Sequence, residues 1–412
     1  MRVIVIGGGA AGFFGAIQAA HANPHLQVTL LEAAAEPLGK VKISGGGRCN
    51  VTHHCFEPVE LISHYPRGGK ALRGPFSRFQ PRDTVDWFAQ HGVKLKTEAD
   101  GRMFPVTDRS QTIIDCLRQA AMATGVKLQT RCPVKSLRLS GSEFSVQTRS
   151  AGTLKARSVL LATGSSRLGY RWAESLGHRL RSPVPSLFTF NIRDSRLKDL
   201  AGLSVQKAQV QLLSPGKHRL IQSGPVLIAH WGLTGPAVLK LSAWGARLLQ
   251  EANYRLPLQI NWLPDYAEAD LRDRLKSMRT ETPKKRVVSL APVPIPRRLW
   301  QRLCQFVEIP EETAWSALSK KHLNQLITEL RQGQYQIQGK GIFKEEFVTC
   351  GGVDLKAVNF KTMESRCCRG LYFAGEILDI DGVTGGFNFQ NAWTTGWIAG
   401  NAIAAAAPIT PS

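Results

Sequence analysis

The sequence predicts an α/β fold, in which a Rossmann-like dinucleotide-binding domain is built from both ends of the chain and interrupted by an inserted domain. Three observations predict this fold. A strand, a glycine fingerprint and a helix open the chain; a strand that ends in a glycine–acid pair lies near its other end; and the composition changes between about residues 186 and 344. At 412 residues the chain also exceeds the size at which one hydrophobic core stops growing, so more than one domain is expected.

The opening segment carries the glycine fingerprint. Residues 2–6 form a short apolar, β-branched run, as in a strand that is buried on both faces. Gly7, Gly9 and Gly12 then form Gly-x-Gly-x-x-Gly. The first glycine makes the tight turn, the second lets the backbone approach a pyrophosphate, and the third lets the following helix pack close to the strand.

The helix after the glycines and the acid after the next strand complete the predicted nucleotide site. A helix of small and apolar residues is expected at 13–20, and unpaired N–H groups at its N-terminus favour the negative charge of phosphates. Ala10 and Ala11, just before it, are predicted to contact the cofactor. A second apolar run, residues 27–31, ends at Glu32, which is placed to bind the ribose of an adenosine half. This order of elements indicates a bound dinucleotide, against the alternative of a glycine-rich turn without a ligand.

A second glycine-rich stretch follows at residues 44–50. Three successive glycines followed by Arg, Cys and Asn make a loop whose backbone could lie against a flat ring and present N–H groups to it. The alternative is a flexible linker. The cofactor-binding residues predicted in and before this loop are Lys40, Ser44, Gly45, Gly46, Arg48, Cys49 and Asn50.

Residues 61–82 contain five basic residues, no acidic residue, and the aromatic residues Tyr65, Phe76 and Phe79. Basic residues interleaved with aromatic ones suit a polyanion with bases that can stack. The alternative is a solvated face whose aromatic side chains point into the core. The predicted RNA contacts are Arg67, Lys70, Arg73, Arg78 and Arg82.

Periodicity predicts the elements that follow. Helices are expected at 84–91 and 110–123, and strands at 126–130, 134–139 and 144–148. A further buried strand begins at Ser158 and ends in Thr163-Gly164. Because ligands of doubly wound sheets bind beyond the carboxyl ends of the strands, Thr163 and Gly164 are expected to close over the same nucleotide.

The composition changes near residue 186, and from there to about residue 344 basic residues outnumber acidic ones roughly two to one. His230 lies here in a compact His-Trp-Gly-Leu-Thr-Gly-Pro turn ahead of an apolar helix expected at 237–249. The predicted division is therefore 1–185 with 345–412 as the nucleotide-binding domain, and 186–344 as an inserted β-rich and helical substrate domain.

The C-terminal part holds the second group of predicted cofactor residues. A glycine–acid pair at the end of a strand can bind a polyol through the carboxylate, and a Gly-Gly turn that opens a helix, expected from 391 to about 405, directs N–H groups and a dipole at an electron-rich ring. The residues predicted here are Gly375, Glu376, Gly385, Gly386, Phe387 and Asn388.

The net charge of +22 is the unusual global feature. Such a surface attracts nucleic acid, anionic lipid or acidic ligands, although a basic surface without a specific partner is the alternative. The absence of a C-x-x-C pair argues against a zinc ribbon or a thioredoxin-type motif, so no metal is predicted. No apolar run is long enough to span a bilayer and the chain opens on a core strand, so a cytoplasmic protein with no membrane partner is expected.

The sequence resembles, nearly end to end, the BaiN/RdsA/aminoacetone-oxidase-like family of flavoproteins. The resemblance rests on the glycine fingerprint with Glu32, Ser44-Gly-Gly-Gly-Arg-Cys-Asn50, His230-x-Gly-Leu-Thr-Gly-Pro236, Thr349-x-Gly-Gly-Val353, and Gly375-Glu376 with Gly385-Gly386-x-Asn388-x-Gln390. It implies the fold of two-dinucleotide-binding-domain flavoproteins, with FAD as cofactor. The fingerprint and Glu32 would hold the ADP half, Glu376 the ribityl side, and residues 45–50 and 385–390 would border the isoalloxazine. One departure is Leu38-Gly39-Lys40, where family members often have Gly-Arg-Lys, so the phosphate contact of that arginine is not carried over.

The resemblance implies an FAD-dependent oxidoreductase and spans three activities: saturation of an enone in bile-acid intermediates, oxidation of a small amine, and reduction of a uridine in large-subunit ribosomal RNA to dihydrouridine. The first and third share one chemistry, in which hydride passes from flavin N5 to a polarised C=C and an acid supplies a proton. An RNA substrate needs a basic surface and a flipped-out base, so reduction of a uridine in 23S rRNA is favoured. A small-molecule reductase or amine oxidase is the alternative, and a non-catalytic flavoprotein or a tRNA-modifying flavoenzyme of another kind stays open.

Two residues are candidates for the proton donor. Cys49 lies in the glycine-rich turn, and His230 lies beside its own glycine turn. The alternatives are a small buried side chain that packs the loop, for Cys49, and a structural hydrogen bond to the backbone, for His230. The expected reductant is NADH or NADPH, which would dock transiently because the chain has no second glycine fingerprint.

Overall fold

The computed structural model describes residues 1–213, 219–341 and 348–407. The chain divides into two compact units: Met1–Val184 with Val348–Ser412, called unit 1, and Pro185–Phe347, called unit 2. The boundary expected at 185/186 lies one residue from the first of these divisions, and the one expected at 344/345 lies outside the described residues. Unit 1 is α/β, and unit 2 is a β-sheet with helices, so the predicted fold class is confirmed.

Unit 1 is built on a seven-stranded sheet in which five strands are parallel, in the order β6-β2-β1-β10-β22. Antiparallel β21 and β20 continue the sheet beyond β22. Side chains of residues 3–6 are at most 4% exposed, because strand β1 has strands on both sides and helices over its faces. The strands are β1 (Arg2–Ile6), β2 (Gln27–Leu31), β6 (Lys127–Gln129), β10 (Ser158–Leu161), β20 (Val358–Asn359), β21 (Glu364–Ser365) and β22 (Leu371–Phe373).

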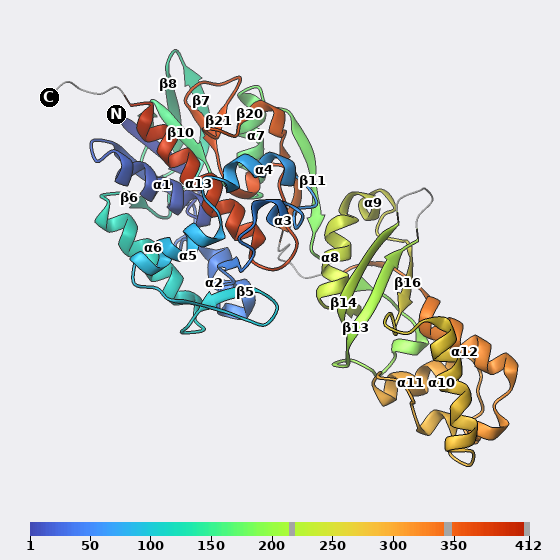
Figure 1. The fold of residues 1–412 in the computed structure, drawn as a ribbon. Helices are drawn as coiled ribbons and strands as arrows, with labels where there is room; N and C mark the ends of the chain where they lie inside the picture. Colours follow the sequence, from blue (N-terminus) through green and yellow to red (C-terminus); the bar gives the residue numbers. More distant parts are fainter. Residues whose placement is uncertain (214–218, 342–347, 408–412) are drawn as a thin grey trace. The chain divides into compact units, whose positions relative to one another are not determined.

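The two ends of the chain meet where helix α1 (Ala10–Ala22) packs along helix α13 (Phe387–Ala405) (Figure 1). A Cβ on Gly396 would lie 2.8 Å from the carbonyl oxygen of Ala11, and one on Gly400 would lie 2.7 Å from that of Gly15. The glycines therefore let the two backbones touch. Helix α13 begins at Phe387, four residues before the expected start, because the αL conformation of Gly386 forms its N-cap.

Smaller elements complete unit 1. The helix expected at 110–123 is confirmed, whereas the one expected at 84–91 begins earlier, at Pro81. The hairpin expected from residue 134 to 148 is confirmed. The elements are α2 (Gly39–Gly47), β3 (Thr52–His53), α3 (Pro58–Ile62), α4 (Gly69–Phe76), α5 (Pro81–Gln90), β4 (Leu95–Thr97), β5 (Arg102–Pro105), α6 (Ser110–Ala123), β7 (Val134–Ser140), β8 (Glu143–Thr148), β9 (Thr153–Ala156), α7 (Arg167–Ser175), β11 (Leu180–Ser186), β19 (Val348–Val353) and η5 (Gly375–Ile377).

Unit 2 contains a seven-stranded sheet in the order β17-β16-β13-β14-β15-β12-β18, and its pairs are antiparallel. Helix α8 packs on strands β13 and β14, and α10, α11 and α12 gather near one another (Figure 1). Trp262, Trp300 and Trp315 are fully buried in the core. The helix expected at 237–249 is broken at Gly245 into two. The elements are β12 (Phe190–Asn191), η1 (Ser195–Leu197), β13 (Ser204–Leu212), β14 (Leu220–Ala229), β15 (Gly232–Thr234), α8 (Pro236–Trp244), α9 (Ala246–Glu251), β16 (Pro257–Asn261), α10 (Glu268–Glu281), α11 (Arg297–Phe306), α12 (Lys320–Gln332), β17 (Gly333–Gln336) and β18 (Gly339–Lys340).

A buried ion network ties the β12–η1 segment to helix α12 in unit 2. The Arg196 side chain is 4% exposed and donates to Asp194 at 2.6 and 2.8 Å and to Glu329 at 2.7 Å. Its guanidinium lies 3.7 Å from the centre of the Tyr335 ring. Burial alone would raise the pKa of Asp194, but the hydrogen bonds and charge of Arg196 hold that pKa below its ordinary value.

Two further features concern the chain as a whole. Among the described residues, no helix is both long enough and apolar enough to cross a membrane. All eight cysteines are free thiols, and seven of them are buried.

Candidate functional site

The fingerprint turn between β1 and α1 leaves open space at one glycine. Gly7 has φ +111°, and a Cβ there would lie 2.4 Å from the carbonyl oxygen of Ala162. A Cβ on Gly12 would lie 1.9 Å from the carbonyl oxygen of Gly7, whereas one on Gly9 would meet no described atom within 4 Å. Packing therefore requires glycine at positions 7 and 12, and position 9 borders the open N-terminus of α1, which no side chain caps. A phosphate fits this position, where Ala10 and Ala11 open the helix.

Glu32 follows directly after β2 and is fixed beside the same turn. One of its carboxylate oxygens accepts a hydrogen bond from the Gly8 N–H at 2.7 Å, and the other accepts one from the Ala34 N–H at 2.7 Å. The carboxylate is thus oriented before any ligand binds, as a ribose contact requires.

Thr163 and Gly164 lie after β10, the strand next to β1. Gly164 has φ +58°, a conformation that favours glycine. The Thr163 hydroxyl is buried and has no hydrogen-bond partner among the described residues. This turn therefore borders the fingerprint, as the sequence predicts, and offers an unsatisfied hydroxyl.

The glycine-rich loop interrupts the helical backbone of α2. Ser44 has ψ 150°, and Gly45 and Gly46 have φ +57° and +70°. A Cβ on Gly45 would lie 2.8 Å from the Phe104 ring, but one on Gly46 or Gly47 would meet no described atom within 4 Å. Gly45 is thus required by packing, and the next two glycines face open space that a flat ring could fill.

Arg48 and Cys49, in the same loop, are engaged with the protein. Arg48 donates to Glu98 at 2.6 Å and lies 4.0 Å from the centre of the Phe104 ring; the hydrogen bond to Glu98 raises the pKa of Arg48. Cys49 is fully buried with φ +62°, and burial raises the pKa of its thiol to about 12. These contacts favour a structural role for Arg48 and the packing alternative for Cys49.

Asn50 joins this loop to the Gly385–Gly386 turn. With its amide oxygen toward the Gly386 N–H, Asn50 accepts that hydrogen bond at 2.9 Å and donates to the carbonyl oxygen of Thr52 at 3.1 Å. Gly386 has φ +92°, and a Cβ there would lie 2.5 Å from the same Thr52 oxygen. The indole N–H of Trp393 also donates to the carbonyl oxygen of Val51 at 2.9 Å. Two glycine segments more than 300 residues apart in the sequence therefore lie against each other.

The remaining residues predicted at the C-terminal end contact the N-terminal elements of unit 1 or hold the Gly385 turn. Glu376 pairs with Lys40 and accepts from the Thr349 N–H at 3.0 Å. A Cβ on Gly375 would lie 2.8 Å from the Cβ of Ala11, at the start of α1. Asn388 accepts from the Gly382 N–H at 2.8 Å and donates to the Gly382 oxygen at 2.9 Å, which fixes the turn that carries Gly385.

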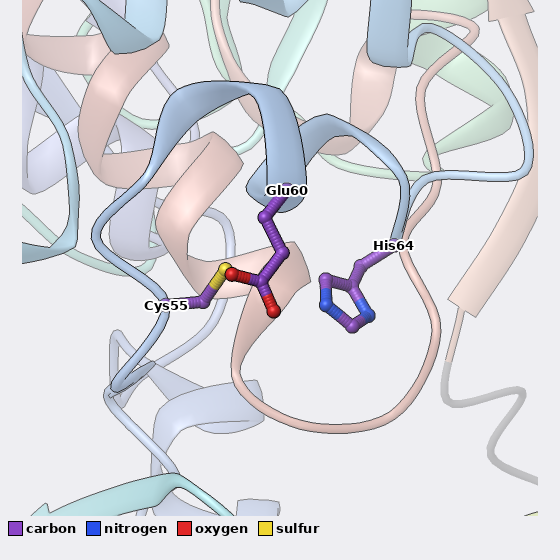
Figure 2. A group of neighbouring side chains, drawn as sticks. All are labelled: Cys55, Glu60 and His64. Carbon is purple, nitrogen blue, oxygen red and sulfur yellow. The ribbon is translucent and has the colours of Figure 1, made fainter.

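Beside this turn lie side chains that sequence reasoning missed. The ring of the buried Phe387 stacks on His64 at 4.2 Å and on His53 at 4.7 Å between ring centres. Figure 2 shows that Cys55, Glu60 and His64 point toward one another, and their potential ligand atoms all lie within 4.8 Å. Burial, helped by the charge of Glu60, raises the pKa of Cys55 to about 11. The signal was the His53-His54-Cys55 stretch directly after the glycine-rich loop.

The Cys55–Glu60–His64 group has the residue types of a metal or proton-transfer site. Thiolate, carboxylate and imidazole are the ligands that zinc prefers, although three of them leave a position open. The group also runs from exposed Glu60 through half-buried His64 to buried Cys55. That order of burial suits the passage of a proton from solvent.

The other predicted residues lie elsewhere. His230 is exposed in unit 2, in the turn between β14 and β15. In unit 1, Arg67 is paired with the buried carboxylate of Asp381, so its charge is not available to RNA. Exposed Lys70 and Arg73 lie on α4.

The predicted aromatic platform beside these basic residues is absent from its expected place. Tyr65, Phe76 and Phe79 are at most 4% exposed, which corresponds to the alternative that they pack in the core. Arg78 donates to the carbonyl oxygen of Lys361 and Arg82 lies over the Phe56 ring, yet both are exposed. This segment therefore offers charge without a stacking surface.

Comparisons with known proteins show the family and the fold of this chain. Residues 1–402 match the family described as HI0933-like protein Rossmann domain. The chain is 30% identical over 411 residues to the ribosomal RNA dihydrouridine synthase of Escherichia coli (strain K12), with 98% of each chain covered. It is 29% identical over 412 residues to the 3-dehydro-bile acid delta(4,6)-reductase of Clostridium scindens, with 98% of this chain and 99% of that one covered. Among solved structures, 3-ketosteroid delta1-dehydrogenase from Sterolibacterium denitrificans has a similar fold, with a TM-score of 0.54 at 13% identity over 98% of this chain and 99% of the other.

Proposed function

Because this chain belongs to the HI0933-like family of Rossmann-domain proteins, we propose that it is an FAD-dependent reductase that converts a uridine of 23S ribosomal RNA to dihydrouridine. The Escherichia coli relative, named a ribosomal RNA dihydrouridine synthase, supports this substrate. The observation that carries the proposal is the junction of the two distant glycine segments through Asn50 and Gly386. It forms a surface of the kind that a flat ring requires.

The residues present fit FAD. Glu32 would bind the adenosine ribose, the backbone around Gly9 would admit the pyrophosphate, and Glu376 would take the ribityl side. Gly46 and the Gly385–Gly386 turn would border the isoalloxazine, since neither offers a side chain in the way. When bound and reduced, FAD supplies a hydride for an electron-poor carbon of a C=C bond.

The chain itself must supply the proton that completes the reduction. The burial of Cys49 and its raised pKa argue against an exchange of that proton with solvent. We place the proton source in the Cys55–Glu60–His64 group, because half-buried His64 and exposed Glu60 offer ligand atoms within 4.8 Å of the Cys55 thiol and would give a proton a route from solvent. His230 stays a second candidate. His64→Gln should slow dihydrouridine formation and alter its pH dependence while reduction of the flavin by NADPH is unchanged; slowing of both steps alike would contradict this role.

The net charge of +22 supports a nucleic-acid substrate, because neutralised phosphates supply most of the affinity for RNA. Lys70, Arg73, Arg78 and Arg82 are the proposed contacts in unit 1, all four exposed. A target uracil inside folded RNA would have to be flipped out to reach a flavin.

The reductant is proposed to be NADH or NADPH. The purified protein should be yellow, and anaerobic addition of NADH or NADPH should bleach the flavin absorbance. Bleaching by a small amine, with reoxidation by dioxygen, would instead favour an amine oxidase.

A small-molecule reductase is the second candidate, supported by the Clostridium scindens relative. An enone substrate would be reduced equally well at high salt, because it needs no phosphate contacts. Dihydrouridine mapping separates the two: deletion of the gene should remove one dihydrouridine from 23S rRNA, and the purified protein with NADPH should restore it. An unchanged dihydrouridine map would contradict the RNA substrate.

A further inference from the structure

Unit 2 contains a groove of about 1100 Å³ that lies outside the proposed flavin site, and the start of the His230–Pro236 motif forms part of its lining. Three chain segments line it: the β12–η1 stretch from Asn191 to Lys198, the β14–β15 turn from Ala229 to Gly232, and Gln336 to Gln338. Arg255 completes the lining. All of these residues belong to unit 2, so the groove exists within one compact body.

The groove is cationic. Arg193, Lys198 and Arg255 are exposed, and within residues 1–213, 219–341 and 348–407 none of the three forms an ion pair. The carboxylate in the lining is that of Asp194, which accepts hydrogen bonds of 2.8 and 2.6 Å from Arg196, the arginine that also pairs with Glu329. Three positive charges, two of them on the β12–η1 stretch and one at Arg255, therefore outnumber the single carboxylate of the lining and favour an anionic ligand.

An aromatic residue lies in the same lining and is held by the backbone. Trp231 is 39% exposed, and its carbonyl oxygen accepts a hydrogen bond from the Ile192 N–H at 3.0 Å, which fixes it next to Arg193. The following residue, Gly232, has φ +147°, and a Cβ there would lie 2.2 Å from the carbonyl oxygen of Phe190. The backbone of the turn therefore has little freedom where it carries the partly exposed Trp231 side chain.

Polar side chains complete the set of groups. Gln336 and Gln338 are exposed in the lining and carry amide donors and acceptors of the kind that base edges need. Cations, an exposed indole and amides together are what single-stranded nucleic acid requires: phosphate contacts, a stacking surface and hydrogen bonds.

We propose that this groove binds a single-stranded segment of RNA, with a base stacked on Trp231 and phosphates held by Arg193, Lys198 and Arg255. The inference rests on the proposed function in that RNA is the substrate, and it assigns the binding of that substrate to unit 2. It also supplies the aromatic platform that residues 61–82 lack, since their aromatic side chains are buried.

The test uses the full-length, flavin-loaded protein and a fluorescein-labelled single-stranded oligouridylate of twelve nucleotides, with the dissociation constant measured by anisotropy over a range of KCl concentrations. Trp231→Ala should weaken binding about tenfold with the salt dependence unchanged. Trp231→Phe should retain most of the affinity, because it keeps an aromatic face. The triple variant Arg193→Gln, Lys198→Gln, Arg255→Gln should lower the slope of log Kd against log salt by about 2.

A matched control removes the same charge elsewhere in unit 2. Lys276→Gln, Lys284→Gln, Lys320→Gln changes three exposed lysines outside the groove lining and should lower the slope far less. Flavin content and circular dichroism show that each variant is folded. An equal loss in the control triple, no loss in Trp231→Ala, no binding by the wild type, or competitive displacement of the oligonucleotide by NADPH would each overturn the proposal.

The experiments distinguish an error in the proposed RNA-binding groove from an error in the proposed reaction. Groove-dependent binding together with no dihydrouridine in treated rRNA would support the groove and reject the reaction. Equal dihydrouridine formation by the wild type and the groove variants would support the reaction and reject the groove.

Discussion

The two units make their candidate binding surfaces in opposite ways. In unit 1, the surface is mainly backbone, and side chains are excluded from it: Gly7 and Gly12 let chain segments touch, and Gly9 leaves open space. In unit 2, the groove is mainly side chains, with Arg193 and Trp231 projecting from strand ends and turns. Binding at the first surface depends on shape, so a single added methyl group is expected to abolish it. Binding at the second depends on charge, so substitutions in the groove are expected to weaken it step by step.

Arg196→Met should have the largest effect and should be confined to unit 2. Removal of the guanidinium leaves the buried carboxylate of Glu329 and the half-buried carboxylate of Asp194 without a counter-ion, which costs about 3–5 kcal/mol. Hydrogen exchange measured by mass spectrometry should speed up in peptides from residues 185–341, and flavin should stay bound. Lys207→Met, which breaks an exposed pair with Asp265, is the control and should change little. Equal acceleration of hydrogen exchange in unit 1 would contradict the prediction that the effect of Arg196→Met is confined to unit 2.

Gly12→Ala and Gly9→Ala should separate packing from ligand approach in unit 1. The Cβ of the first variant would collide with the Gly7 oxygen, so a loss of about 3 kcal/mol in the free energy of unfolding is expected, with loss of flavin. The second variant meets no described atom, and its φ of −89° suits alanine, so its melting temperature should not change while its affinity for FAD falls. Thermal unfolding and flavin titration measure the two effects. Equal melting temperatures for both variants would contradict the assignment of Gly12 to packing and Gly9 to ligand approach.

Asp194→Asn should remove part of the pH dependence of stability. The pKa of Asp194 is lower in the folded protein, so its stabilising contribution is complete above its ordinary pKa and is lost as pH falls through the folded value. Urea unfolding should therefore show the wild type more stable than the variant at pH 6, and this difference should shrink as the pH falls below the ordinary pKa of an aspartate. Asp265→Asn, at an exposed pair, serves as the control. A constant difference across this range would be incompatible with the prediction.

Arg73→Gln should give the smallest effect, on RNA affinity alone. Arg73 is exposed on α4, where the neighbouring aromatic side chains are buried, so it can contribute a phosphate contact only. Affinity for the oligouridylate should fall roughly threefold at 0.15 M salt, with a slope lower by about 1. A loss as large as that of Trp231→Ala would move the main RNA surface to unit 1.

The backbone-based site was largely predictable from sequence because glycine spacing records where chain segments must touch. The fold class, the family resemblance and the order strand–glycine–helix–strand–acid are confirmed. The junction of the two glycine segments followed from that resemblance, whereas its hydrogen bond from Gly386 to Asn50 is visible only in the structure.

The groove of unit 2 and the contacts of residues 61–82 depend on segments far apart in the sequence, and such long-range contacts leave no local pattern in the sequence. The groove joins Arg193, Trp231, Arg255 and Gln336 only because antiparallel strands bring these positions together. Likewise, the aromatic residues among 61–82 could not be assigned to core or surface from spacing alone. The engagement of Arg67 by Asp381, 314 residues away, was equally hidden.

The contact of α1 with α13 has a consequence for the order in which the protein matures on the ribosome. The first helix has to wait for a partner that is made nearly 380 residues later, and strand β10 waits for β22. The inserted segment is contiguous and has its own core, so it can become compact first during synthesis. Cofactor capture is thereby postponed until α13 has been synthesised, and nascent chains stalled before α13 should carry a folded insert and no yellow colour.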